Sequence, residues 1–214
     1  MVLKLYGHAM STCSQRILVV LLEKQVPYEL IEVDFANREH KSPEYLAKQP
    51  FGQIPYIDDD GFILYETRAI CRYIAAKYAD QGTKLLPTGL KENALFEQAA
   101  SIEQSNFEPS AHGAVFENLF KLLHGLVPDQ TVFEEHLKKL DAKLDAYEVI
   151  LSKQKYLAGD ELTLADLFHL PHGFYLAQAG SNIMETKPNV ARWFKEISSR
   201  PSWEAVKMEI KIPA

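Results

Sequence analysis

Cysteine is nearly absent from this chain. Its 214 residues include only Cys13 and Cys71, and neither a CxxC pair nor a metal-type spacing occurs. A disulfide framework and a cysteine-based metal site are therefore excluded. Scarce, unpaired cysteines are typical of a reducing compartment, so we expect a cytoplasmic protein.

Long apolar runs and an excess of positive charge are also missing. No run approaches the roughly 20 apolar residues that a membrane helix needs. The formal net charge of −6 argues against general nucleic-acid binding, which requires a basic face. The first residues lack the three-part pattern of a secretory signal peptide. We therefore expect neither a membrane nor a nucleic acid among the partners.

Ordinary globular composition is what remains, with 47% hydrophobic and 24% charged residues. The first third alternates strand and helix patterns. Strands are predicted at 2–6, 28–34, 55–58 and 62–65, and helices at 14–24 and 67–78, with a short irregular helix around 41–48. This βαβ, then ββα, order predicts one sheet with a right-handed parallel crossover. Residues 1–78 therefore form a thioredoxin-like domain.

The rest of the chain has a purely helical pattern after a linker at 79–90, which contains Gly82, Pro87 and Gly89. Helices are predicted at 91–120, 129–152, 163–177, 188–199 and 202–209. Thr163 and Asp166 have the spacing of a capping box, with Asp in place of the usual Glu or Gln. We therefore predict an all-helical domain over 91–214.

The segment Gln49-Pro50-Phe51-Gly52-Gln53-Ile54-Pro55 carries the clearest chemistry. A proline at a strand entrance is a candidate cis bond, and it would leave the backbone of Ile54 at a sheet edge. Such an edge can pair with an extended peptide. Glu66-Thr67 then opens a helix, whose N-terminal amides favour a carboxylate. Together these features indicate a small, charged, peptide-like ligand.

These residues resemble the glutathione-binding core of glutathione transferases, most closely the phi class. Four further segments of the chain resemble that class. They are Gly7-His8-Ala9-Met10-Ser11, Glu66-Thr67-Arg68-Ala69-Ile70, Tyr156-Leu157-Ala158-Gly159 and Leu162-Thr163-Leu164-Ala165-Asp166. The resemblance covers nearly the whole chain. It implies the glutathione transferase fold, with a thioredoxin-like N-terminal domain and an all-helical C-terminal domain. It also implies a homodimer, glutathione as co-substrate and no metal.

The resemblance implies that the glutathione thiolate attacks a hydrophobic electrophile, with peroxidase activity as a further option. Ser11 would be the catalytic residue that stabilises the thiolate. From the residues alone, Ser11, Thr12 and Ser14 read more simply as helix caps. A thiol at a helix N-terminus nevertheless has its pKa lowered.

The expected glutathione-binding residues come from three segments. His40, Lys41 and Gln53 would hold the glycine carboxylate, with His40 and Lys41 as two adjacent cations. Ile54, followed by Pro55, would bind through its backbone. Glu66 and Thr67 would hold the γ-glutamyl end through a carboxylate and a hydroxyl with its amide. Arg68 reads as a dimer or surface residue.

A hydrophobic site for the second substrate is expected by positional analogy at Met10, Phe35, Phe116, Phe120 and Tyr175. Aromatic residues at helical spacing are more often core residues, so packing is the alternative. His169 and His172 share a helix face but have no third ligand at a sensible spacing, which favours packing over a metal site.

Two other functions fit parts of the sequence. Ser11-Thr12-Cys13-Ser14-Gln15-Arg16 also resembles the motif of zeta-class isomerases, although Glu66-Thr67 fits the phi class better. A non-catalytic ligand carrier is the second alternative. Cys13 is interpreted as a packed or accessory thiol, and Cys71 as a buried one. Nothing in the sequence chooses among aryl halides, isothiocyanates and hydroperoxides as substrates.

Overall fold

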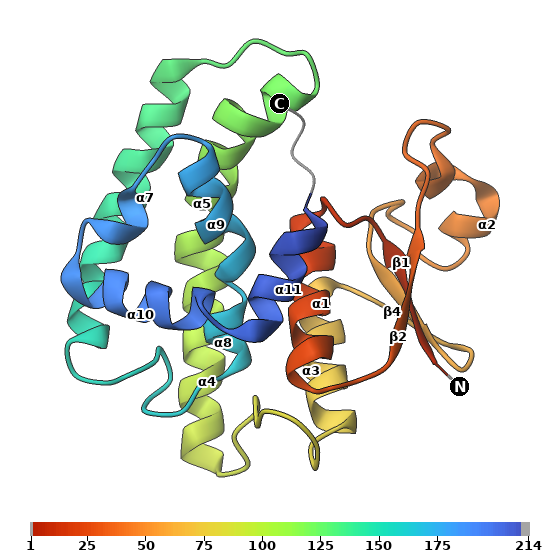
Figure 1. The fold of residues 1–214 in the computed structure, drawn as a ribbon, viewed down its shortest axis with the longest axis horizontal. Coiled ribbons are helices and arrows are strands. Elements are labelled where there is room, and N and C mark those ends of the chain that lie inside the picture. The colour runs from red at the N-terminus through yellow and green to blue at the C-terminus, as the bar shows by residue number, and fades with distance from the viewer. Residues whose placement is uncertain (1, 211–214) are drawn as a thin grey trace. The chain divides into compact units, whose positions relative to one another are not determined.

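The structure is a computed structural model that describes residues 2–210. It divides into two compact units (Figure 1). The first contains the chain through Lys84 and the end of the last helix from Ala205 onward, and the second runs from Leu85 to Glu204.

The first unit is built as the sequence predicts. Its elements are β1 (Leu3–Gly7), α1 (Thr12–Glu23), β2 (Tyr28–Glu32), a 3₁₀ turn (Glu39–Lys41), α2 (Pro43–Leu46), β3 (Tyr56–Asp59), β4 (Phe62–Tyr65) and α3 (Thr67–Lys77). The expected helix around 41–48 is the 3₁₀ turn followed by one turn of α-helix. Ser42 begins α2 because its side chain accepts the N–H of Tyr45.

Among the described residues, the strands form one sheet in the order β2-β1-β3-β4. β1 is parallel to β2, and β3 is antiparallel to both β1 and β4. Tyr6 lies opposite Tyr56, which lies opposite Tyr65. The C-terminal ends of β1 and β4 and the N-terminal end of β3 therefore meet at one end of the sheet.

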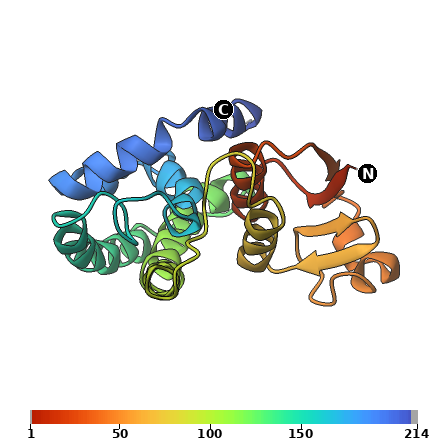
Figure 2. The same cartoon turned by 90° about the horizontal axis from the view of Figure 1, so that it is seen from below.

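Helices cover both faces of this sheet, with α1 and α3 on one side and α2 on the other (Figures 1 and 2). Because successive strand residues point to opposite faces, Leu5 and Tyr6 belong to different packing layers. Fully buried apolar residues such as Ile17, Leu21 and Ile70 fill the first layer. The second layer contains stacked Tyr6 and Tyr56 rings, with centroids 4.4 Å apart.

The second unit is helical throughout its described residues. It contains α4 (Leu90–Ile102), a π-helical turn (Glu103–Phe107), α5 (Glu108–Val115), a second π-helical turn (Phe116–Phe120), α6 (Lys121–Leu123), α7 (Gln130–Leu151), α8 (Leu164–Leu167), α9 (Leu170–Gln178), a 3₁₀ turn (Ile183–Glu185), α10 (Pro188–Ser198) and the first residues, through Glu204, of α11 (Pro201–Glu209).

Two predicted helices are interrupted, and proline explains one break in each, whereas no proline lies at the second π-helical turn, Phe116–Phe120. The helix expected at 91–120 widens before Pro109, where the Glu108 N–H donates to Glu103 O, five residues back. The helix expected at 163–177 breaks at 168–169, before Pro171. Proline lacks an N–H, and its ring collides with the carbonyl four residues earlier, so regular α-helical bonding cannot continue through it.

The predicted capping box is confirmed at α8. The Asp166 carboxylate accepts the N–H of Thr163 at 2.9 Å and its hydroxyl at 3.0 Å. Its other oxygen accepts the N–H of Leu157 and the indole N–H of Trp193. Burial raises the pKa of Asp166, and these donors oppose the rise. One buried carboxylate thus joins three segments of the unit.

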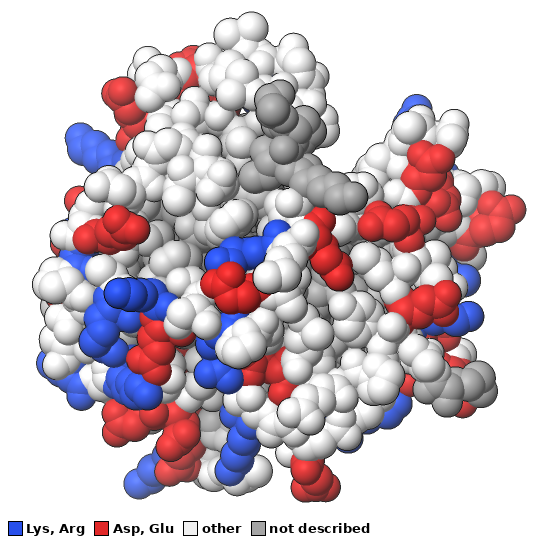
Figure 3. All heavy atoms as spheres, in the orientation of Figure 1, with Lys and Arg blue, Asp and Glu red and all other residues white. Residues whose placement is uncertain are grey.

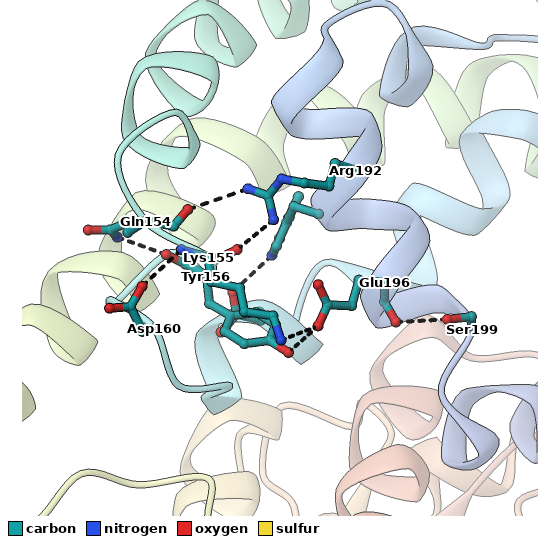
Figure 4. Close-up of polar contacts among 9 residues, drawn as sticks. Gln154, Lys155, Tyr156, Asp160, Arg192, Glu196 and Ser199 are labelled. Atoms are coloured by element: carbon teal, nitrogen blue, oxygen red, sulfur yellow. Dashed lines mark hydrogen bonds and ion pairs between the residues drawn. The ribbon is translucent and has the colours of Figure 1, made fainter.

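The loop after α7 is held to α10 by polar contacts (Figure 4). Arg192 donates to the carbonyl of Leu151 at 3.0 Å and to that of Lys155 at 3.2 Å. Glu196 accepts the Tyr156 hydroxyl at 2.6 Å and pairs with the Lys155 ammonium at 2.9 Å. The bond to Leu151 O satisfies a carbonyl in the last turn of α7, where a helix has no internal partner, and the other contacts fix the loop that follows.

Acidic and basic side chains are interspersed on the face shown in Figure 3. Within residues 2–210, no helix combines the length and the hydrophobicity that crossing a membrane requires.

Candidate active site

Three groups of predicted site residues lie in segments that join the first unit's sheet at one end. The loop of residues 8–11 follows β1, Ile54–Pro55 precedes β3, and Glu66–Thr67 follows β4. A Cβ on Gly7 would lie 3.4 Å from Pro55 Cβ and 2.5 Å from Ser14 Oγ. The end of β1 therefore touches both the start of α1 and the entrance of β3, so the register gathers residues that are far apart in the sequence.

Ser11 is the N-cap of α1, so the simple capping interpretation is confirmed. Its backbone is extended (φ −77°, ψ 122°), and its Oγ accepts the Ser14 N–H at 3.3 Å. A hydroxyl that accepts a hydrogen bond keeps its own hydrogen for donation. Capping therefore leaves Ser11 able to donate, at the positive end of a helix of 12 residues.

The Ile54–Pro55 peptide bond is cis, as predicted. Ile54 lies beyond Tyr56, the last β3 residue paired with β1. The preceding residue, Gln53, has an exposed side chain, and its carbonyl accepts the Tyr45 hydroxyl at 2.8 Å. Burial, and then the neighbouring Tyr56, raise the pKa of Tyr45, so its hydroxyl stays protonated and can donate. The sequence offered no motif that singled out Tyr45.

Glu66 has an unusual backbone conformation, with φ 72° and ψ 105°. A positive φ is uncommon for a residue other than glycine, and it costs on the order of 1–3 kcal/mol. The conformation turns the chain from β4 directly into α3. Glu66 is exposed, whereas Thr67, the first residue of α3, is only 8% exposed. A carboxylate thus precedes a hydroxyl and the free amides of a helix N-terminus.

His40 and Lys41 lie in the 3₁₀ turn, and they differ from the expected pair of cations. Burial, followed by the charges of Lys41 and Arg38, lowers the pKa of His40, which favours a neutral ring at pH 7. That ring lies 4.6 Å from the ring of Phe35.

The Lys41 ammonium donates to the carbonyls of Phe51 and Gly52 at 3.2 and 2.7 Å. An ammonium has three donors, so one remains for an anion. The sequence pattern identified the two residues, but it could not show that burial lowers the pKa of His40 and so disfavours its charged form.

The residues expected at the hydrophobic site differ in exposure. In the first unit, Phe35 is 45% exposed and Met10 is half-buried. In the second unit, Phe116 is 39% exposed, whereas Tyr175 is fully buried. The Tyr175 ring packs 5.5 Å from half-buried Phe120, which indicates a core role for Tyr175 in this unit. The assignment of these five residues to a substrate site stays a prediction.

The buried histidines serve packing, as expected. His169 bonds to Ala165 O and to the Tyr147 hydroxyl through its two ring nitrogens. His172 pairs with Glu108 at 2.9 Å. Among residues 2–210, no group of three or more His, Cys, Asp or Glu side chains is arranged to hold a metal. Burial raises the pKa of Cys71 to about 12, so this thiol is unreactive.

Comparison with known proteins identifies the family. Residues 1–76 match the family described as Glutathione S-transferase, N-terminal domain, and residues 107–201 match Glutathione S-transferase, C-terminal domain. Glutathione S-transferase hmp2 of Hypomyces subiculosus is 48% identical over 207 residues, which cover 95% of this chain and 96% of that protein.

Solved structures of glutathione transferases have the same fold as this chain. Glutathione transferase F7 from Populus trichocarpa superimposes with a TM-score of 0.93 at 43% identity, covering 98% of this chain and all of the other. Maize glutathione S-transferase I, in complex with an atrazine glutathione conjugate, gives a TM-score of 0.90 at 35% identity, with each chain fully covered.

The chain therefore belongs to the glutathione transferase family, whose enzymes use glutathione as co-substrate. Within the family it is a phi-class transferase, because the relatives include F-type enzymes at high identity over almost the whole chain.

Proposed function

We propose that this transferase conjugates reduced glutathione to hydrophobic electrophiles and that the Ser11 hydroxyl stabilises the glutathione thiolate. The observation that carries the proposal is the state of Ser11. Its oxygen is held by the Ser14 N–H at the start of α1, while its hydrogen remains to be donated. A donor beside a helix N-terminus favours thiolate over thiol, and the thiolate is the nucleophile.

The remaining predicted residues suit the other groups of glutathione. Glu66 can accept from the γ-glutamyl ammonium, and Thr67 can donate its hydroxyl and amide to the adjacent carboxylate. Lys41, with its remaining donor, and neutral His40 can bind the glycine carboxylate, with Gln53 beside them. The backbone of Ile54 can pair with the cysteinyl residue, in the manner of an added strand.

Displacement of chloride from a chlorotriazine is the most direct candidate reaction. The thiolate sulfur forms a bond to the ring carbon, the carbon–chlorine bond breaks, and chloride leaves with the electron pair. The atrazine conjugate bound to the similar maize enzyme supports this class of substrate. Attack of the same thiolate on a hydroperoxide would form a sulfur–oxygen bond, break the O–O bond and release the alcohol. A second glutathione would then convert the resulting sulfenic acid into glutathione disulfide and water, which is the peroxidase activity that the sequence left open.

A homodimer in the cytoplasm is part of the proposal. Phe51 and Phe62 in the first unit are 63% and 49% exposed, and a second copy could cover such apolar surface. The test is light scattering after size-exclusion chromatography. A dimer has twice the chain mass of 24.3 kDa, and a species with the mass of one chain would contradict the proposal.

Two assays test the chemistry. In the first, glutathione is combined with an aryl chloride, an isothiocyanate, a lipid hydroperoxide and a maleyl substrate in parallel. Turnover of the maleyl compound alone would favour the isomerase alternative. Glutathione binding without turnover of any substrate would favour the carrier.

The second assay compares the protein with Ser11→Ala by the ultraviolet absorbance of bound thiolate against pH. We expect the pKa of the bound thiol to rise toward its free value, with little change in glutathione affinity, because the helix and the peptide edge remain. Each unit of rise is a tenfold loss of thiolate at pH values below the pKa. An unchanged pKa of the bound thiol in Ser11→Ala would show that Ser11 does not stabilise the thiolate.

A further inference from the structure

His8 closes the loop that carries Ser11 through two hydrogen bonds. The Met10 N–H donates to His8 Nδ1 at 3.1 Å, and the Ser11 N–H donates to His8 O at 2.9 Å. Both donors lie in the short stretch between His8 and the start of α1. The position at which the chain delivers Ser11 therefore depends on His8.

Side chains from α1 hold the same loop from the other side. The His8 N–H donates to Ser14 Oγ at 3.2 Å, and Gln15 Nε2 donates to Ala9 O at 2.8 Å. Ser14 in turn donates its N–H to Ser11 Oγ. The backbone of His8, the side chain and N–H of Ser14, and the hydroxyl and N–H of Ser11 thus form a closed set of contacts, which the imidazole of His8 joins through Met10.

The Met10 bond requires a neutral imidazole with an unprotonated Nδ1, so the ring hydrogen is on Nε2. Nε2 faces the Glu32 carboxylate, at the end of β2, across 3.7 Å. The Phe35 ring also packs against the imidazole in a T-shaped pair, with centroids 6.0 Å apart, and the His40 ring contacts Phe35 in turn. A proton added to Nδ1 would oppose the Met10 N–H and break the bond.

We propose that His8 is a positioning residue for the transferase reaction, and that its neutral imidazole folds the loop so that the Ser11 hydroxyl meets the glutathione thiolate. This inference rests on the proposed role of Ser11. Protonation of Nδ1 would remove the acceptor for the Met10 N–H and release the loop, in addition to the effect of protonating the thiol. Activity would therefore fall more steeply toward low pH than thiol protonation alone predicts.

Two substitutions separate the hydrogen bond from the titration. In His8→Asn the side-chain oxygen can accept the N–H two residues ahead, as in an Asx turn, and it does not titrate. We expect near-normal kcat and a shallower acid limb of the pH–rate profile.

In His8→Ala the bond is lost at every pH. We expect the bound thiol to titrate about one pH unit higher, with kcat at pH 6.5 about tenfold lower. Glutathione affinity, measured by calorimetry, should stay unchanged.

Ser11→Ala and the double variant His8→Ala/Ser11→Ala complete the cycle. If His8 acts through Ser11, the double variant has the thiol pKa of Ser11→Ala alone. A further rise in the double variant, or a normal thiol pKa in His8→Ala, would overturn the role of His8 while Ser11 keeps its own. A normal thiol pKa in Ser11→Ala would instead overturn the proposed function. Should His8→Ala not fold, the acid limb of His8→Asn decides, and an unchanged limb contradicts the inference.

Discussion

Glu66 combines a predicted binding role with a strained backbone conformation. Its φ of 72° lies where non-glycine residues are uncommon, yet a glycine there would lack the carboxylate. The position thus combines a sharp turn into α3 with an exposed negative charge. In the proposed binding mode this charge meets the end of glutathione far from the sulfur, so we expect it to act in binding and not in chemistry.

Replacing Glu66 tests this division. In Glu66→Ala, the loss of a charged hydrogen bond should weaken glutathione binding by about 1.5–3 kcal/mol, or roughly 10- to 150-fold. In Glu66→Gln, an acceptor remains without the charge, so a smaller loss is expected. The thiol pKa of the complex should not change in either variant. Calorimetry that finds normal affinity for Glu66→Ala would show that the γ-glutamyl end binds elsewhere.

At the scale of elements, α2 and the turn before it hold the loop that enters β3. Lys41 bonds to the carbonyls of Phe51 and Gly52, and Tyr45 bonds to that of Gln53. Gly52 is necessary for this approach, because at φ 59° a Cβ would lie 2.7 Å from His40 O. One short helical segment thus supports the residues expected to bind both the glycine end and the backbone of glutathione.

Tyr45→Phe removes only the hydroxyl that holds Gln53. The buried ring remains, so the fold should persist, and the lost hydrogen bond is worth about 0.5–1.5 kcal/mol. We expect the KM for glutathione to rise about 2- to 10-fold, with kcat little changed, because the loop positions the peptide and not Ser11. Steady-state kinetics measure both constants. A fall in kcat at constant KM would show that the loop acts on the reacting thiolate.

The linker ahead of α4 passes close to the end of α1 at Gly82. Gly82 has φ 59°, and a Cβ there would lie 2.3 Å from Glu23 O at the end of α1. Gly61, in the β3–β4 turn, has φ 89° but nothing within 4 Å of a Cβ. We expect Gly61→Ala to lower the unfolding free energy by about 1–2 kcal/mol, the cost of a positive φ, and Gly82→Ala to lower it by more. Urea denaturation measures both losses of unfolding free energy. Equal losses would mean that the linker moves to accommodate the Cβ at Gly82 with no additional loss of stability.

At the scale of the whole molecule, several carboxylates have lowered pKa values, so acid should unfold the protein. Glu148 on α7 is an example. Burial raises its pKa, but bonds from the N–H groups of Val190 and Asn189 and from the Asn189 side chain outweigh this and lower it. A folded pKa below the unfolded one contributes stability above the unfolded value, and that stability is lost as pH falls through the folded value. Asp166, whose pKa is raised by burial, acts in the opposite direction.

Glu148→Gln tests this account. At pH 7 the variant should unfold at a lower temperature, because the amide is a weaker acceptor for the amides at the start of α10. The difference should shrink as pH falls below the ordinary glutamate pKa and through the lowered pKa of Glu148, because the native carboxylate is then progressively protonated. Thermal unfolding followed by circular dichroism across pH measures the effect. A difference independent of pH would assign the loss to packing instead of charge.

The sequence by itself determined the strands, most helix boundaries, the cis proline, the capping box and the family. These depend on neighbours in the chain, such as the Gly52 turn before Ile54–Pro55 or the spacing of Thr163 and Asp166. Only the tertiary structure decided that His40 has a lowered pKa, that Lys41 and Tyr45 hold the β3 loop, that Tyr175 is buried and that Ser11 keeps a free donor. Desolvation and hydrogen-bond partners come from residues that folding brings together, so their effects are absent from any local pattern.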